Sequence, residues 1–434
     1  MTVADREMID AVPARASRRA LAAWCLYDWA NSAFPTVVVT FVFAAYFTEG
    51  VAADRDSGTA MWANGQSLSA ILIAILSPCL GAIADRTGRR KPWILGFSLL
   101  CILATAGLWF VRPDPGYAML AIVLVVLGNL GFELGITFYN ALLPELVAKE
   151  WIGRLSGWAW GIGYAGGLSC LILSLMIFVQ ADPPRFGLDP AAAEHVRAVA
   201  PFAAAWMLLF IWPLFAFVRD VPRRGPSLLK AVGEGLETLW HTLLRIRDYR
   251  DIARFLVANM IYIDGLNTLF SFGGIYAAGQ FGMAIDEVLL FGILLNISAG
   301  LGAAGFAWLD DFLGAKPTIL ISLGALILLC SGILLVRDKT LFYALGIGIG
   351  IFLGPAQAAS RSLMARLAPA DMRGEFFGLF ALSGRVTSFL GPLLVGWVTY
   401  LAASQRVGMA MILPFFIIGA LILMSVDVRR AGGR

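Results

Sequence analysis

Charge is scarce in this sequence. Only 14% of the 434 residues are charged and 59% are hydrophobic, whereas soluble domains carry about a quarter charged residues. Histidine is scarcer still, with only His195 and His241, and this excludes a histidine-based metal site. A nucleotide-binding Gly-x4-Gly-Lys-Ser/Thr stretch is absent as well. The composition therefore predicts a membrane protein that is not an enzyme and that needs no metal or cofactor.

Cysteine is present but is not placed to form structural disulfides. All five cysteines fall within apolar runs, and none falls in an extracytoplasmic loop, where an oxidised pair would be expected. We interpret them as small buried apolar residues. They are Cys25, Cys79, Cys101, Cys170 and Cys330.

Long apolar runs dominate the chain. We count twelve, each of roughly 17 to 25 residues, which is long enough to cross about 30 Å of hydrocarbon. They predict an all-α membrane protein with twelve transmembrane helices. Their approximate bounds are 20–47, 61–84, 92–111, 117–139, 155–179, 199–218, 251–279, 285–309, 316–336, 341–364, 376–400 and 409–426.

The basic residues predict the orientation. The charged leader runs straight into a helix too long for a signal-peptide core, so we expect it to stay in the cytoplasm. With both termini inside, about 25 of the 33 basic residues fall in cytoplasmic segments, about 7 outside and one, Arg385, within a helix. The positive-inside rule is thus met, and the net charge of +4 is a topology signal that does not indicate nucleic-acid binding.

A polar segment divides the chain into two six-helix halves, 1–218 and 251–434. In the intervening segment 219–250, Leu228, Val232 and Leu236 begin an apolar stripe at helical spacing, after a break at Gly225 and Pro226. We expect an amphipathic helix lying on the inner membrane surface.

The halves echo one another in sequence. Asp28, Asn31, Ser32 and Phe34 in the first helix match Asp264, Asn267, Thr268 and Phe270 in the seventh. The loops after helices 2 and 8 also match, with Asp85, Gly88, Arg90 and Pro92 against Asp311, Gly314, Lys316 and Pro317. This pattern indicates two parallel repeats, as in transporters whose halves are related by an axis along the membrane normal.

The loop "GAIADRTGRRKPW" between helices 2 and 3 resembles the loop motif of the major facilitator superfamily. Three further stretches resemble its vacuole effluxer branch, which includes autophagy-related amino-acid exporters: "WCLYDWANSAF", "YNALLPELV" and "SRSLMARLAPADMRGEFFGLFALSGRVTSFLGP". The resemblance implies the superfamily fold, alternating access and export of neutral amino acids.

Four ionisable residues lie deep in apolar runs. Counting from the cytoplasmic ends places Asp28, Glu133, Asp264 and Arg385 at depths of roughly 13 to 18 Å. Facing lipid they would together cost on the order of 10 kcal/mol, so they must face water or one another. In a transporter built of two halves, the substrate site is expected at that level.

We expect this group to contact the substrate or a coupling proton. Arg385 offers a planar fork to an anion, and a carboxylate of Asp28 or Asp264 would hold an ammonium or carry the proton. The alternative is a structural salt-bridge network that joins helices 1, 7 and 11. The complete set of predicted substrate- or proton-binding residues is Asp28, Asn31, Glu133, Asp264, Asn267, Gln357 and Arg385.

A second set of charges lies at the cytoplasmic helix ends. Asp85 could reach the start of helix 11, and Asp311 and Lys316 could reach Arg154 at the start of helix 5, so that these contacts close the cytoplasmic side. The alternative is that they only fix topology. The complete set of predicted gating residues is Asp85, Arg89, Arg90, Arg154, Asp311, Lys316 and Glu375.

These features together predict a gradient-driven secondary transporter of a small polar or zwitterionic solute, most simply a neutral amino acid that is exported with proton coupling. Two alternatives remain: a transporter of a sugar, nucleoside or drug-like compound, and a membrane sensor or scaffold that transports nothing. We expect a monomer in the bilayer of the inner cell membrane, with both termini cytoplasmic and no nucleic-acid partner.

Overall fold

The computed structural model describes residues 16–181, 183–220 and 228–428. Within these ranges every regular element is a helix, which confirms the all-α prediction. The N-terminal half contains α2 (Arg18–Asn31), the π-helix η1 (Phe34–Phe41), α3 (Phe43–Tyr46), η2 (Phe47–Val51), α4 (Arg55–Thr87), α5 (Lys91–Gly107), α6 (Ala118–Leu146), α7 (Ile152–Ser174), α8 (Glu194–Arg197) and α9 (Val199–Phe217). After the linker helix α10 (Leu228–Leu244) come α11 (Arg250–Phe281), α12 (Ile285–Leu313), α13 (Ala315–Leu335), α14 (Lys339–Leu367), α15 (Arg373–Ser383), α16 (Leu390–Ala402), α17 (Gln405–Ala410) and α18 (Ile412–Met424).

Eleven helical segments of the described chain are long and apolar enough to cross a membrane. The sequence predicted twelve crossings, and the difference lies at 376–400. There the chain forms two shorter helices, α15 and α16, which are separated by a turn at residues 384–389. The remaining expected runs coincide with long helical segments, although some ends differ: α4 begins before the expected run 61–84, and α6 extends to Leu146, beyond the expected run 117–139.

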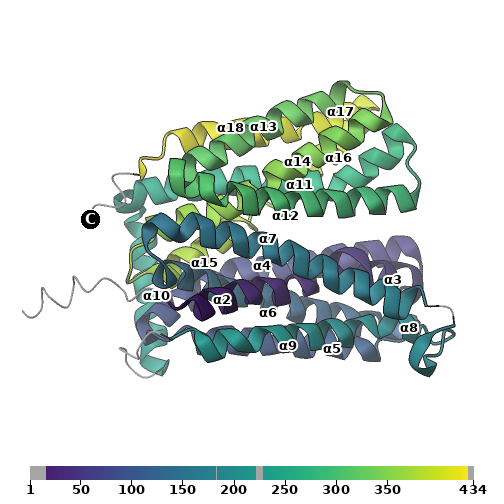
Figure 1. The fold of residues 1–434 in the computed structure, drawn as a ribbon, viewed down its shortest axis with the longest axis horizontal. Coiled ribbons are helices and arrows are strands. Elements are labelled where there is room, and N and C mark those ends of the chain that lie inside the picture. The colour runs from purple at the N-terminus through teal and green to yellow at the C-terminus, as the bar shows by residue number, and fades with distance from the viewer. Residues whose placement is uncertain (1–15, 182, 221–227, 429–434) are drawn as a thin grey trace, which may run out of the picture.

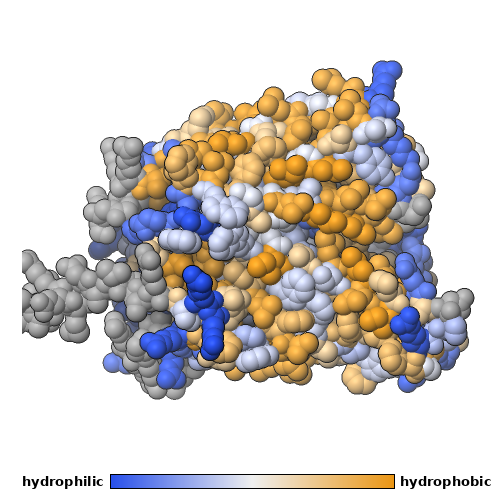
Figure 2. Space-filling model, in the orientation of Figure 1, coloured by the Kyte–Doolittle hydropathy of each residue, from blue (hydrophilic) through white to orange (hydrophobic). Residues whose placement is uncertain are grey.

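The helices run side by side, with the N-terminal half in one layer and most of the C-terminal half in the other (Figure 1). The exception is α15 of the C-terminal half, which lies against α4 of the N-terminal half. We call the end at which α4, α12 and α14 finish the basic end, because Arg86, Arg89, Arg90, Lys91, Lys316, Arg366 and Arg373 gather there. Figure 2 shows hydrophobic side chains along the flank of the molecule and hydrophilic ones at its two ends, the arrangement that a bilayer requires.

Equivalent loops in the two halves are built alike. The helices α4 and α12 both end in a glycine with positive φ, Gly88 at 75° and Gly314 at 97°, a conformation that glycine adopts without steric cost. The next helix then has Lys-Pro in its first turn, where the fixed φ of proline is suited to a helix.

The two lysines of these loops act as helix C-caps within their own halves. Lys91 donates to the carbonyls of Phe215 (2.7 Å) and Val218 (2.6 Å) at the end of α9. Lys316 donates to those of Met424 (2.8 Å) and Val426 (2.7 Å) at the end of α18. The expectation that Lys316 reaches Arg154 in the other half is therefore wrong, because its ammonium is taken up by the free carbonyls of a helix C-terminus.

Proline widens the first membrane helix beside the centre of the protein. Pro35 has no N–H to continue the α-helical ladder, and residues 34–41 wind instead as the π-helix η1. The Thr40 hydroxyl donates to the carbonyl of Pro35 at 2.9 Å. The wider turn lies next to the interface between the halves.

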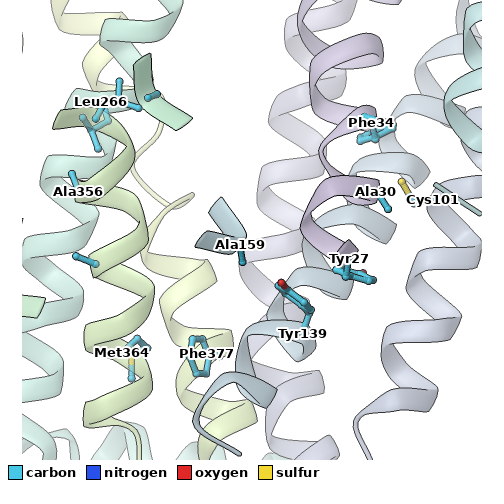
Figure 3. Packing of buried hydrophobic residues seen from close by; sticks show 14 of the residues in the cluster. Tyr27, Ala30, Phe34, Cys101, Tyr139, Ala159, Leu266, Ala356, Met364 and Phe377 are labelled. Atoms are coloured by element: carbon cyan, nitrogen blue, oxygen red, sulfur yellow. The ribbon is translucent and has the colours of Figure 1, made fainter. Parts of the chain in front are cut away.

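The buried apolar residues of the two halves form one continuous core. Figure 3 shows Tyr27, Phe34 and Tyr139 packed among helices of the N-terminal half, with Leu266, Ala356 and Met364 on helices of the other half. Ala159 of α7 and Phe377 of α15 lie between the two groups, so both helices pack along the interface between the halves.

The linker helix α10 packs against the basic end of the N-terminal half. A Cβ on Gly235 would lie 2.9 Å from the backbone nitrogen of Ile83 in α4. Part of the expected apolar stripe, Val232, Leu236 and Trp240, is exposed on another face, where it is free to meet a bilayer surface. The break expected at Gly225 and Pro226 lies outside the described residues.

Candidate functional site

A cavity of about 400 Å³ lies between the two halves. Side chains from α2, α6 and α7 line it on one side and side chains from α11, α14 and α15 on the other. Apolar and aromatic residues make up much of its wall, as is usual for small-molecule sites. Its polar lining comprises Asp28, Ser32, Thr36, Thr40, Glu133, Thr137, Asn140, Tyr164, Asn259, Asn267, Asn296, Gln357, Ser360, Arg361 and Arg385.

The first ion pair at the cavity joins Asp28 of α2 to Arg361 of α14. Arg361 Nη1 lies 2.9 Å from Asp28 Oδ2, and both side chains are buried. Arg361 also donates to the hydroxyl (2.9 Å) and the carbonyl (2.7 Å) of Ser156 and to Asn140 Oδ1 (3.3 Å). All these partners belong to the N-terminal half, so a side chain of the C-terminal half ends within a polar socket of the other.

Aromatic rings complete this socket. The Arg361 guanidinium carbon lies 5.0 Å from the ring centroid of Trp24, 5.5 Å from that of Trp160 and 5.9 Å from that of Tyr139. Such contacts stabilise a desolvated guanidinium by roughly 1 to 2 kcal/mol each. Every nitrogen of Arg361 thus has a hydrogen-bond partner, and we interpret this side chain as fixed in place.

A second ion pair, Glu133 of α6 with Arg385 of the α15–α16 turn, also spans the two halves. Its surroundings differ from those of the first pair. Within the described chain, the side chain of Arg385 bonds only to Glu133, through one of its three nitrogens, and 38% of it is accessible from the cavity. Arg385 therefore keeps donors free for another anion.

The cavity contains five of the seven residues expected at the site. Besides Asp28, Glu133 and Arg385, these are Asn267 and Gln357, whose Oε1 accepts from the Tyr164 hydroxyl of the other half at 3.1 Å.

Asn31 and Asp264 are buried but are not among the cavity-lining residues. The expectation of a shared cavity face for Asp28 with Asn31, and for Asp264 with Asn267, is therefore wrong. Side chains three residues apart on an α-helix point in directions that differ by about 60°. This difference is enough to turn one residue of each pair away from the cavity and toward a neighbouring helix.

Arg361 is the principal residue that sequence reasoning missed. It lies inside the run 341–364 that we expected to cross the membrane, and an arginine within such a run is a functional signal by default. Its proximity to the basic end, about six residues from the end of α14, made it look like a topology charge. The expected network of helices 1, 7 and 11 is accordingly replaced by pairs that join α2 to α14 and α6 to the α15–α16 turn.

Two carboxylates at the basic end each cap a helix of the opposite half. Asp85 at the end of α4 accepts from the backbone N–H groups of Gly374 and Glu375, both at 2.8 Å, in the first turn of α15. Asp311 at the end of α12 accepts from those of Gly153 (2.8 Å) and Arg154 (3.1 Å) in the first turn of α7. Both arrangements satisfy free N–H groups and complement the helix dipole.

Glycine lets the same helices touch along their basic halves. A Cβ on Gly81 of α4 would lie 2.1 Å from the carbonyl oxygen of Gly374 in α15, and one on Gly157 of α7 would lie 2.5 Å from that of Ala303 in α12. No larger residue fits at either position without separating the backbones, as is typical of tight membrane-helix pairs. The basic end of the interface is therefore closed in this structure.

Arginine–carboxylate pairs surround both caps. Arg90 pairs with Asp85 at 3.4 Å and with Glu145, and Arg373 of the other half also reaches Glu145 at 3.4 Å. Around Asp311, Arg154 lies at 2.7 Å.

On the same side, Arg366 bridges Asp310 (2.7 Å) and Asp311 (3.0 Å). Arg89, also expected here, is exposed and forms no ion pair with a described residue.

Comparison with known proteins agrees with this architecture. Residues 56–433 match the family described as "Vacuole effluxer Atg22 like". The chain is 27% identical over 405 residues to a Bacillus subtilis protein described as an uncharacterized MFS-type transporter, YxiO, covering 92% of this chain and 93% of that one. It is 24% identical to autophagy-related protein 22 of Kluyveromyces lactis, covering 84% and 79% of the two chains.

Solved structures of other proteins share the fold. The proton:xylose symporter XylE aligns with a TM-score of 0.73 at 14% identity, over 94% of this chain and 95% of its own. The transporter FucP in an outward conformation aligns with a TM-score of 0.71 at 14% identity, over 94% and 98% of the two chains. At these identities the likeness concerns the fold alone.

Proposed function

Because the chain belongs to the vacuole effluxer Atg22-like family of the major facilitator superfamily, we propose that this multi-pass membrane transporter exports a small zwitterion, a neutral amino acid, in exchange for protons. The observation that carries the proposal is the Glu133–Arg385 pair in the cavity between the halves. A zwitterion can replace such a pair charge for charge, with its carboxylate on Arg385 and its ammonium on Glu133.

The two ion pairs would have different roles, one structural and one in solute binding. Arg361 has partners on all its nitrogens and is enclosed by aromatic rings, so it and Asp28 position the halves. Arg385 has free donors and reaches the cavity, so it is the group that can accept a carboxylate in a two-bond fork. Asn267 and Gln357 supply orienting hydrogen bonds.

The rest of the cavity suits an apolar amino-acid side chain. Phe132, Ile136, Trp160, Phe270 and Phe380 line it, as does Tyr164. A volume of about 400 Å³ is near the lower end of ligand cavities, which span roughly 300 to 1,000 Å³. This favours a single small metabolite over an extended drug-like compound.

Proton exchange follows from competition at Glu133. A proton on this carboxylate and the ammonium of a bound solute cannot occupy it together, so each displaces the other. An exchanger needs this mutual exclusion. An inward proton gradient would then drive the solute outward across the cell membrane, with the basic end in the cytoplasm as the positive-inside rule requires.

Alternating access would use the closed basic end as one of its two states. Opening that end breaks the caps formed by Asp85 and Asp311 and the glycine contacts of α4 with α15 and of α7 with α12. The contacts of α4 with α15 and of α7 with α12 are discrete contacts between rigid halves. Opening the basic end is therefore a switch between two packings of the halves.

Glu375 should make this switch sensitive to pH. It lies at the basic end, just before the expected span 376–400, and is 1% exposed. Burial, with the negative charges of Asp85 and Asp371, raises the pKa of its carboxyl from 4.5 to about 7, although a Thr242 hydrogen bond and Arg86 oppose the rise. Protonation therefore favours the closed basic end. This stabilisation is complete below about pH 4.5 and is lost as the pH rises through about 7.

We expect the closed fraction in the wild type to fall over that window, by a free energy on the order of 3 kcal/mol, and we expect Glu375→Gln to remove the pH dependence. Spin labels at Arg89 and Ala370, which are exposed on opposite halves at the basic end, report the separation. Glu150→Gln, which alters an exposed carboxylate at the same end, is the control and should leave the wild-type profile. An unchanged profile in Glu375→Gln would contradict the assignment.

Purified protein in liposomes tests the transport proposal. Liposomes loaded with unlabelled leucine or tyrosine should accumulate the labelled amino acid by counterflow, and an imposed pH gradient should shift the accumulation. Labelled xylose and uridine serve as comparison solutes. Flux of these without amino-acid flux would favour the sugar or nucleoside alternative, and no flux of any solute would favour a sensor or scaffold.

A further inference from the structure

Asp264 of α11 is a buried carboxylate that the cavity does not use. It is 1% exposed, its Oδ2 accepts from the backbone N–H of Gly391 at 3.3 Å, and its Oδ1 is buried without a hydrogen-bond partner among the described residues. In hydrocarbon a carboxylate with one long hydrogen bond is costly when ionised and much cheaper when protonated. The site therefore suits a carboxyl group that gains and loses a proton.

Gly391 is the second residue of α16, the helix that resumes after the break in this membrane segment. The first N–H groups of a helix have no partner within it, and an acidic side chain there acts as a cap. Asp264 supplies that cap from a neighbouring helix. Glycine is required at the contact, because a Cβ on Gly391 would lie 1.9 Å from Thr268 Oγ1 and 3.1 Å from Asp264 Oδ1.

The turn that α16 follows carries Arg385, and it packs along α11 beside Asp264. Thr387 donates to the carbonyl of Met260 at 3.4 Å, and a Cβ on Gly384 would contact Ile263 at 3.9 Å. The same short stretch of α11 thus holds the turn at one end and the start of α16 at the other. A change in the cap at Gly391 is therefore placed to alter the conformation of the turn and with it the position of Arg385.

No described cation holds Asp264 in its ionised form. The titratable and charged side chains on the elements packed against α11 bond to other residues or lie near helix ends. They are Arg247, Asp248 and Tyr249 on the short helix η8 (Ile246–Tyr249); Glu287, Asp310 and Asp311 on α12; Lys339, Tyr343, Arg361 and Arg366 on α14; Arg373 and Glu375 on α15; Arg385 in the turn; Tyr400 on α16; and Arg406 on α17. The described part of α18, Ile412–Met424, carries none.

We propose that Asp264 is a proton-binding site separate from the substrate cavity, and that it acts as a positioning residue for Arg385. Ionised Asp264 caps α16 strongly and holds the turn in the conformation that presents Arg385 to the cavity. Protonated Asp264 caps it weakly and lets the turn relax. The inference rests on the proposed function and deepens it, because a proton that binds Asp264, as well as one that binds Glu133, would affect solute binding by Arg385.

Amide hydrogen exchange of the full-length protein in lipid nanodiscs tests the proposal without any solute. After correction for the intrinsic pH dependence of exchange, protection of peptides covering 384–391 should rise about fivefold as Asp264 ionises, the effect of a cap worth about 1 kcal/mol. Asp264→Asn keeps an acceptor but cannot titrate, so its protection should not vary with pH. Asp56→Asn, an exposed acid at the other end of the molecule, should behave as wild type.

Infrared spectroscopy supplies a second measurement. The wild type should show the C=O stretch of a protonated buried carboxyl, and that band should vanish with rising pH over the range in which protection increases. A wild-type profile that is flat with pH, or an Asp264→Asn variant that keeps the wild-type profile, would overturn the proposal. Should the variant not fold, the wild-type profile decides alone. Because neither readout involves transport, failure here and failure of the proposed function are distinguishable.

Discussion

Replacing Arg361 with alanine is expected to destabilise the protein by about 3 to 5 kcal/mol, the usual cost of breaking a buried ion pair from one side. The substitution leaves Asp28 buried without its cationic partner and removes three further hydrogen bonds, two to Ser156 and one to Asn140. It also empties the space between Trp24 and Trp160. Thermal unfolding in detergent, followed by tryptophan fluorescence, measures the loss.

Arg361→Lys should recover only part of this stability, because an ammonium cannot reproduce the planar fork that reaches Asp28 and Ser156 together. The double variant Arg361→Leu with Asp28→Leu removes both charges and should be more stable than Arg361→Ala. Arg337→Ala, at an exposed arginine, is the matched control. If Arg361→Ala unfolds at the same temperature as this control, the contacts of Arg361 contribute nothing to the stability of the protein.

Replacing Arg385 with glutamine should weaken solute binding by about 100-fold while leaving thermal stability nearly unchanged. The loss corresponds to a charge-assisted fork worth about 3 kcal/mol. Stability is spared because Arg385 is partly solvated and, among the described residues, its side chain bonds only to Glu133. The concentration dependence of labelled leucine counterflow measures the effect, with Arg337→Gln as the control.

Glu133→Gln separates the two roles of this pair. The variant keeps Arg385 as an anion site but cannot exchange a proton for an ammonium, so residual leucine counterflow should respond more weakly to pH, through the proposed titrations of Glu375 and Asp264. Wild-type flux in Arg385→Gln would remove this residue from the site. A wild-type pH response in Glu133→Gln would place the coupling proton elsewhere.

The sequence predicts the fold because apolar length and charge asymmetry are local properties of the chain. It also points to the caps at the basic end, since an aspartate before the loop of each half stands at a helix end that must meet the other half. It cannot give the partner of a charge, because pairing depends on helix rotation and on the way the halves pack. Hence Asp28 pairs with Arg361, although counting residues along the helices placed Arg385 at the same depth as Asp28. Asp264 likewise contacts the N-terminus of α16.

Distances between spin labels at the two ends of the interface between the halves test the central claim, that access to the cavity alternates between these ends. After replacement of the five native cysteines, one pair of labels is placed at Arg89 and Ala370 at the basic end, and another at Asp56 and Ala402 at the opposite end, all of them exposed. We predict two populations at each end that shift in opposite directions with pH or leucine, one pair lengthening as the other shortens. A single unchanging distance at both ends under all conditions would contradict alternating access.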